Sequence, residues 1–245
     1  MRAYLSRIAI IGAALVGLAF LVQPAAAHKQ SDLRTEMRKL WEDHVTWTRN
    51  YIVSALAGLD DAGPVAQRLL KNQDDIGAAI TPYYGEAAGK KLAELLRDHI
   101  LIAADVVSAA KAGNAEQLAS SQQKWQANGE DIAAFLSGAN PHWAKEATRS
   151  MLREHLTFTT NEVVARLKKD WAADIKAYDD GHVHMLMFAD QLADGIAKQF
   201  PGNSSAPAAP AFRRTEPARC QTHLPRAPIV QGRKGHSRAR VPFSL

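Results

Sequence analysis

The chain has 245 residues, of which 47% are hydrophobic and 22% charged, which suits one globular domain with appendages. Its formal net charge of +5 comes from the two ends, because residues 28–200 hold twenty basic and twenty-four acidic side chains, a net charge of −4. This central part is therefore too acidic to suggest a nucleic-acid-binding surface, and the single cysteine, Cys220, excludes a disulfide within the chain.

The first 27 residues have the pattern of an export signal. Arg2 and Arg7 precede an apolar run at 8–22, and the alanines at 25–27 supply the small side chains of a cleavage site. The apolar run of 15 residues is shorter than the roughly 20 residues that span a bilayer. We predict a signal peptide at residues 1–27 and a mature chain that is periplasmic or secreted. A membrane contact is expected only if the signal segment stays uncleaved.

Residues 28–200 have the pattern of an all-α domain. Apolar residues recur at spacings of three and four, and Ala, Leu, Lys, Glu and Gln are frequent. Among the breaks, Gly113 is typical of a helix C-cap, and Asn140 followed by Pro141 is typical of a helix start. The breaks predict six helices, at about 32–58, 63–81, 86–112, 115–137, 141–168 and 171–200.

The composition changes after this domain. Residues 201–245 are rich in Pro, Ala, Ser and Arg and have no amphipathic period. Such a segment cannot bury enough apolar surface to fold. We therefore predict a disordered basic tail.

One sequence pattern occurs three times, with histidines 55 and 56 residues apart. It places an acid directly before a histidine inside an apolar helix, at Asp43–His44, Asp98–His99 and Glu154–His155. A repeat of this length indicates a structural unit that is copied along the chain. We therefore predict a six-helix bundle built from three repeated helical hairpins.

The three histidines are expected to face the core. Residues three and four positions away on the same helices are mostly apolar, and residues at that spacing share one face of a helix. In an antiparallel pair, residues equidistant from the turn lie level, so each histidine should meet a polar residue on the second helix of its hairpin. The expected pairs are His44 with Asn72, His99 with Asn128, and His155 with His182.

These six side chains would form one polar layer inside the bundle. A buried polar group without a partner costs about 1–3 kcal/mol. Six of them would cost roughly 6–18 kcal/mol, which is comparable with the whole stability of a domain, about 5–15 kcal/mol. The layer must therefore be satisfied from within, by water or by a bound ligand.

Three interpretations of the layer follow. The first is a structural hydrogen-bond network that sets the register of the hairpins. The second is a transition-metal site, since imidazole suits Cu, Zn, Fe and Ni. Its expected ligands are His44, His99, His155 and His182, with Met185, His184, Asp75 or Asp131 nearby. The third is a pocket for a small polar ligand, bound by Asn72 and Asn128. His184 itself is expected at the surface and Met185 in the core.

Five blocks of the sequence together resemble a family of small bacterial all-helical proteins. The blocks are LWEDHVTWTR, RLLKNQDDIGAAITPYYG, LLRDHILIAADVVSAAKAGN, MLREHLTFT and ADGIAKQF, and they span residues 40–200 nearly end to end. Members of that family have no assigned function and carry inherited names such as glycosyltransferase or acetylglutamate kinase. Both activities normally belong to α/β folds with nucleotide-binding loops, which this sequence lacks. Residues 201–245 depart from the family, whose members usually end near the segment KQFP.

The sequence contains no HExxH, GxSxG, GxGxxG or Asp-x-Asp motif. We therefore expect an exported binding protein, whose ligand is a transition-metal ion or a small polar molecule. The alternatives are an enzyme that matches the glycosyltransferase name, and a structural envelope protein that has no ligand.

Overall fold

The computed structural model describes residues 25–202 as six α-helices joined by short connections. The helices are α1 (Ala25–Ala57), α2 (Ala62–Tyr84), α3 (Glu86–Ala112), α4 (Ala115–Ala139), α5 (Lys145–Leu167) and α6 (Trp171–Gln199). The predicted all-α bundle of three hairpins is confirmed. No helix in this range is long and apolar enough to cross a membrane. Most of the predicted signal peptide, Cys220 and nearly all of the basic tail lie outside the described residues.

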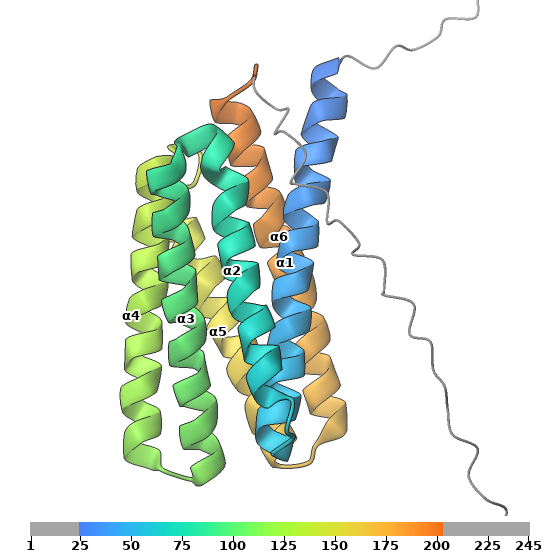
Figure 1. Ribbon diagram of the computed structural model, residues 1–245, viewed down its shortest axis with the longest axis vertical. Coiled ribbons are helices and arrows are strands. Elements are labelled where there is room, and N and C mark those ends of the chain that lie inside the picture. Colours follow the sequence, from blue (N-terminus) through green and yellow to red (C-terminus); the bar gives the residue numbers. More distant parts are fainter. Residues whose placement is uncertain (1–24, 203–245) are drawn as a thin grey trace, which may run out of the picture. The chain divides into compact units, whose positions relative to one another are not determined.

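The helices close into a ring around one interior (Figure 1). Each helix packs against the next in the sequence, and α6 returns to pack against α1. The first helices of the hairpins also meet, because α3 contacts both α1 and α5. Side chains that α1, α3 and α5 direct inward therefore gather at the centre of the bundle.

Local sequence signals account for most helix ends. Gly113 has a φ of 66° and closes α3 in the left-handed conformation that favours glycine. The side chain of Asn114 then caps α4 by accepting a hydrogen bond from the backbone N–H of Gln117, at 3.0 Å. Asp170 caps α6 in the same way through the backbone N–H of Ala173. The predicted breaks at these two turns are confirmed.

The helix start predicted at Asn140 and Pro141 is wrong, because α5 begins at Lys145. Asn140 instead ends α4, and its side-chain amide donates to the hydroxyl of Tyr84 at 2.8 Å. The connection that follows folds inward, since Trp143 is only 1% exposed and packs against α6. Burial of this indole outweighs the capping signal, which sequence alone cannot weigh against it.

Helices α2 and α3 approach each other most closely where two glycines face. A Cβ atom added to Gly77 would lie 2.5 Å from the carbonyl oxygen of Gly89 and 2.7 Å from the Cβ of Ala93. A Cβ on Gly89 would lie 2.7 Å from the carbonyl oxygen of Gly77. The two backbones are therefore in direct contact, and only glycine leaves room for it.

Buried charges connect α1 to the third hairpin. Arg49 of α1 donates to Glu162 of α5 at 2.7 Å and to Asp174 of α6 at 2.8 Å. Arg166 donates to the same Asp174 at 2.8 Å. The two carboxylates are 5% and 1% exposed, so each needs the opposite charge that the arginines supply.

Candidate functional site

The three repeat histidines meet at the centre of the bundle. His44, His99 and His155 are 2%, 3% and 7% exposed, so the prediction that they face the core is confirmed. The ring of His155 contacts both of the others, with centroid distances of 5.5 Å to His44 and 6.0 Å to His99. One histidine from each hairpin therefore contributes to a single cluster of imidazoles.

His99 has both ring nitrogens engaged by the protein. The indole N–H of Trp125 can only donate, and it lies 3.1 Å from Nε2 of His99. The hydrogen of the imidazole must then be on Nδ1, which lies 2.7 Å from Oδ1 of Asn128. The predicted pair of His99 and Asn128 is confirmed, and it is complete without a ligand.

His44 is held differently. Its partner is Gln73 rather than the predicted Asn72: the side-chain amide of Gln73 lies 3.3 Å from Nδ1 of His44. The same amide nitrogen also donates to the carbonyl of Leu69 at 2.9 Å and to Oδ1 of Asn72 at 3.1 Å. Within the described residues, Nε2 of His44 has no hydrogen-bond partner, so one of its nitrogens is unused.

The ring of His155 makes no hydrogen bond to any other residue of the described chain. Nearby, Oγ1 of Thr48 and Oε1 of Gln73 are buried and also have no partner there. Each such group costs about 1–3 kcal/mol if nothing satisfies it. The cluster therefore has unused hydrogen-bonding capacity on the His44 and His155 side and none on the His99 side.

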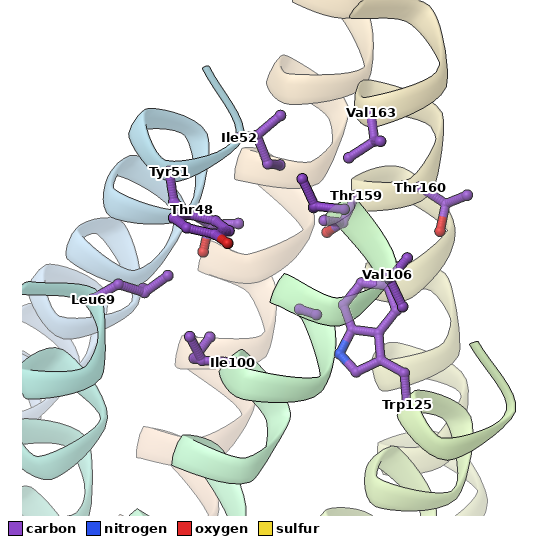
Figure 2. Close-up of a pocket in the computed structure, with 12 residues that line it drawn as sticks. Thr48, Tyr51, Ile52, Leu69, Ile100, Val106, Trp125, Thr159, Thr160 and Val163 are labelled. Carbon is purple, nitrogen blue, oxygen red and sulfur yellow. The ribbon is translucent and has the colours of Figure 1, made fainter. Parts of the chain in front are cut away.

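Two small cavities adjoin the cluster, and Thr48 and Thr159 line both. The first lies among apolar side chains of α1, α2, α3 and α5, with the Trp125 indole of α4 on one side (Figure 2). The second is lined by His155 and Met185, among others. Each gives the centre of a guest about 20 Å³, which is room for about one water molecule or ion.

The predicted pair of His155 and His182 is not formed. His182 lies outside the cluster with 28% of its side chain exposed, where its Nε2 is 2.6 Å from a carboxylate oxygen of Glu42 and its ring stacks on Tyr178. His184, which we expected at the surface, is only 7% exposed. Residues 182 and 184 point about 200° apart on a helix, so only one of them can face the core.

His184 shares its role with the two asparagines. Nε2 of His184 lies 2.8 Å from the carbonyl oxygen of Met151. The amides of Asn72 and Asn128 donate to the carbonyls of Leu40 and Leu95, each at 3.0 Å. All three carbonyls belong to the residue four positions before a repeat histidine. The second helix of each hairpin is thus bonded to the first at the same point of the repeat.

A regular spacing in the sequence would have identified two of the residues that the turn midpoints missed. Gln73, Asn128 and His184 each lie 29 residues after the histidine of their hairpin. The midpoint argument placed the third turn at residues 168 and 169, whereas the turn also includes Asp170, the N-cap of α6. This shift of one residue selects His184 over His182. No comparable signal marks Trp125 as the second partner of His99.

Burial keeps all three imidazoles neutral. The apolar interior lowers the pKa of His44 from 6.5 to about 3 and that of His99 to about 4. Burial also lowers the pKa of His155 well below 6.5, and the neighbouring histidines lower it further because a second positive charge in the cluster would be repelled. The neutral form is the one that binds metal ions.

The acids near the cluster do not extend it. Asp75 is half exposed and pairs with Lys71 on the surface, and Asp131 is exposed. Asp43 pairs with Arg68 at 2.9 Å. In residues 25–202, no group of three or more His, Cys, Asp or Glu side chains has an arrangement that would hold a metal ion. A metal ion in the interior would thus depend on fewer imidazoles and on a ligand of another type.

Comparisons with known protein families, curated proteins and solved structures found no significant match.

Proposed function

We propose that this chain is an exported binding protein that holds one transition-metal ion beside His44 and His155, with the thioether of Met185 as a further ligand. The supporting observation is that these two buried, neutral imidazoles are neighbours and keep ring nitrogens that the protein does not use. Export is inferred from residues 1–27 of the sequence alone.

The spacing of the two rings suits a shared ion. With metal–nitrogen distances of about 2 Å, two imidazoles on one ion have ring centres about 5–6 Å apart, and those of His44 and His155 are 5.5 Å apart. His99 is excluded from this set, because Asn128 and Trp125 already occupy both of its nitrogens.

The ligand types favour copper(I) over the other ions. Zinc normally takes three or four protein ligands, and the interior offers two free imidazoles. Imidazole and thioether are the softer ligands that select copper(I), and Met185 lines the same cavity as His155. A single positive charge is also less costly to bury than two, since the nearest buried acid, Glu162, is already paired with Arg49.

The test is a copper(I) titration of the untagged protein under reducing conditions, in competition with a chromogenic chelator. We expect one equivalent per chain and a loss of affinity of more than about tenfold in His155→Phe. The matched control is His182→Ala, which removes a partly exposed histidine outside the cluster and should bind as the wild type does. Thermal unfolding of each variant establishes that it is folded.

A structural role without a ligand is the second candidate. It is favoured by the completed bonds of His99 and by the three bonds from second helices to backbone carbonyls. In that case the wild type takes no copper(I) from the chelator, or His155→Phe takes as much as the wild type does. Either result would contradict the metal-binding proposal.

A further inference from the structure

A groove of about 770 Å³ runs along the outside of the bundle between α4 and α5. Sites for small molecules typically have volumes of about 300–1,000 Å³. The two interior cavities hold about one water each, so the groove is the larger of the sites found in the described residues by a wide margin.

The groove exists because α4 and α5 are not joined as a hairpin. Within each hairpin the two helices pack closely, whereas α4 and α5 pack less closely than any other consecutive pair. In Figure 1, α5 leans away from α4 toward α6 as it descends from their connection. The faces that line the gap are polar, so apolar packing does not close it.

Four carboxamides line the groove with unused bonding capacity. They are Gln122, Gln123 and Gln126 of α4 and Asn161 of α5. Their side chains make no hydrogen bond to any other residue of the described chain. A carboxamide offers two donors and an acceptor together, which complements a ligand whose own groups both donate and accept.

The charges in the groove compensate each other. Arg149 and Arg153 of α5 both bond to Glu130 of α4, with the shortest contact of Arg153 at 2.8 Å. Arg149 also donates to Glu146 at 2.7 Å. Burial would raise the pKa of Glu130, but the bonds from the two arginines outweigh it and lower that pKa. The guanidinium groups are fixed in place and leave no net positive charge for an anion.

The floor of the groove is apolar and leads to the interior. It includes Trp125 and Leu156, which are 3% and 7% exposed. Because the indole N–H of Trp125 donates to His99, a ligand that presses on this ring acts on a bond whose NMR signal can be observed.

We propose that this groove binds a small, uncharged molecule that carries several hydroxyl groups, such as a mono- or disaccharide. A hydroxyl group both donates and accepts, as the four carboxamides do, while the apolar floor fits the carbon skeleton of such a ligand. The proposal goes beyond copper binding and does not rest on it, because the groove and the histidine cluster are separate sites.

The experiment follows the indole N–H of Trp125 by NMR in copper-free, isotope-labelled full-length protein. The signal is identified by its absence in Trp125→Phe. Maltose and N-acetylglucosamine are the neutral probes, and inorganic phosphate is the charged comparison. We expect saturable shifts with at least one sugar and none with phosphate.

Paired variants test the position of the site. The double variant Gln126→Ala/Asn161→Ala should bind the sugar about tenfold more weakly, which corresponds to one or two lost hydrogen bonds. Gln67→Ala, which removes an exposed amide from α2, should leave the affinity unchanged. The proposal is overturned if neither sugar gives a saturable shift, if phosphate binds in their place, or if the double variant binds as the wild type does.

Discussion

At the scale of single residues, the interior shows one hydrogen-bonding task carried out by different side chains. Asn72, Asn128 and His184 each donate to a backbone carbonyl on the facing helix. The donor differs between amide and imidazole, but its position in the repeat does not. Satisfaction of a buried carbonyl, rather than the identity of the side chain, is therefore what the three hairpins have in common.

Replacement of His99 by alanine should destabilise the fold. The change leaves Oδ1 of Asn128 and the indole N–H of Trp125 without partners in a dry interior. We expect a loss of about 1–3 kcal/mol in the free energy of unfolding from the unpaired groups, in addition to the lost packing. Urea denaturation at pH 7 measures it.

The control for this change is His142→Ala, which removes an exposed ring between α4 and α5. It should change the free energy of unfolding by less than about 0.5 kcal/mol. Equal stability of His99→Ala and the wild type would show that the bonds of His99 contribute nothing.

At the scale of helices, close packing and register decide how each hairpin uses its polar residues. In the first hairpin, Gln73 bonds to the histidine and Asn72 bonds to the carbonyl. In the second hairpin, Asn128 does both. The first hairpin thus divides between two neighbouring residues what the second assigns to one. Small differences in how two helices pack account for such a division without a change in the fold.

The contact between α2 and α3 provides a test at this scale. Gly77→Ala would place a methyl group against the backbone of α3, 2.5 Å from a carbonyl oxygen. We expect a loss of about 1–3 kcal/mol from overpacking, although alanine is the better helix former. Thermal or urea unfolding measures the change.

Gly129→Ala in α4 is the matched comparison. A Cβ atom there would have nothing within 4 Å, so only helix propensity acts and the variant should gain up to about 1 kcal/mol. If both alanine variants shifted stability in the same direction, the close contact of α2 and α3 would not be a determinant of the fold.

At the scale of the whole molecule, the histidine cluster makes stability depend on pH. The unfolded chain takes up protons on these imidazoles near the ordinary pKa of 6.5. The folded chain does so only near pH 3 for His44 and near pH 4 for His99. The contribution of the cluster is therefore complete above pH 6.5 and is lost as the pH falls below it.

The expected slope is large. Each histidine that titrates only in the unfolded chain costs about 1.4 kcal/mol per pH unit, so three cost about 4 kcal/mol per unit between roughly pH 6 and pH 4. Urea denaturation at pH 7, 6 and 5 should show this fall, and His155→Phe should reduce the slope by about a third. A free energy of unfolding that stays constant from pH 7 to pH 5 would contradict the burial of neutral imidazoles.

Much of this molecule is specified by local sequence. The spacing of apolar residues defines six helices, and Gly113, Asn114 and Asp170 act through their own backbone and nearest neighbours. The repeat of an acid and a histidine at intervals of 55 and 56 residues likewise implies equivalent hairpins, and helical periodicity turns all three histidines inward. Each of these inferences needs only the geometry of a single helix or turn.

Other features were decided by contacts between helices distant in the sequence. His184 faces the core in place of His182, Trp125 takes the second nitrogen of His99, and Trp143 draws the segment before α5 inward. The groove between α4 and α5 likewise depends on how two hairpins lean against each other. Local propensities fix the direction of a side chain only relative to its own helix, whereas its partners depend on the rotation and height of the facing helix, and these are set by the packing of the whole bundle.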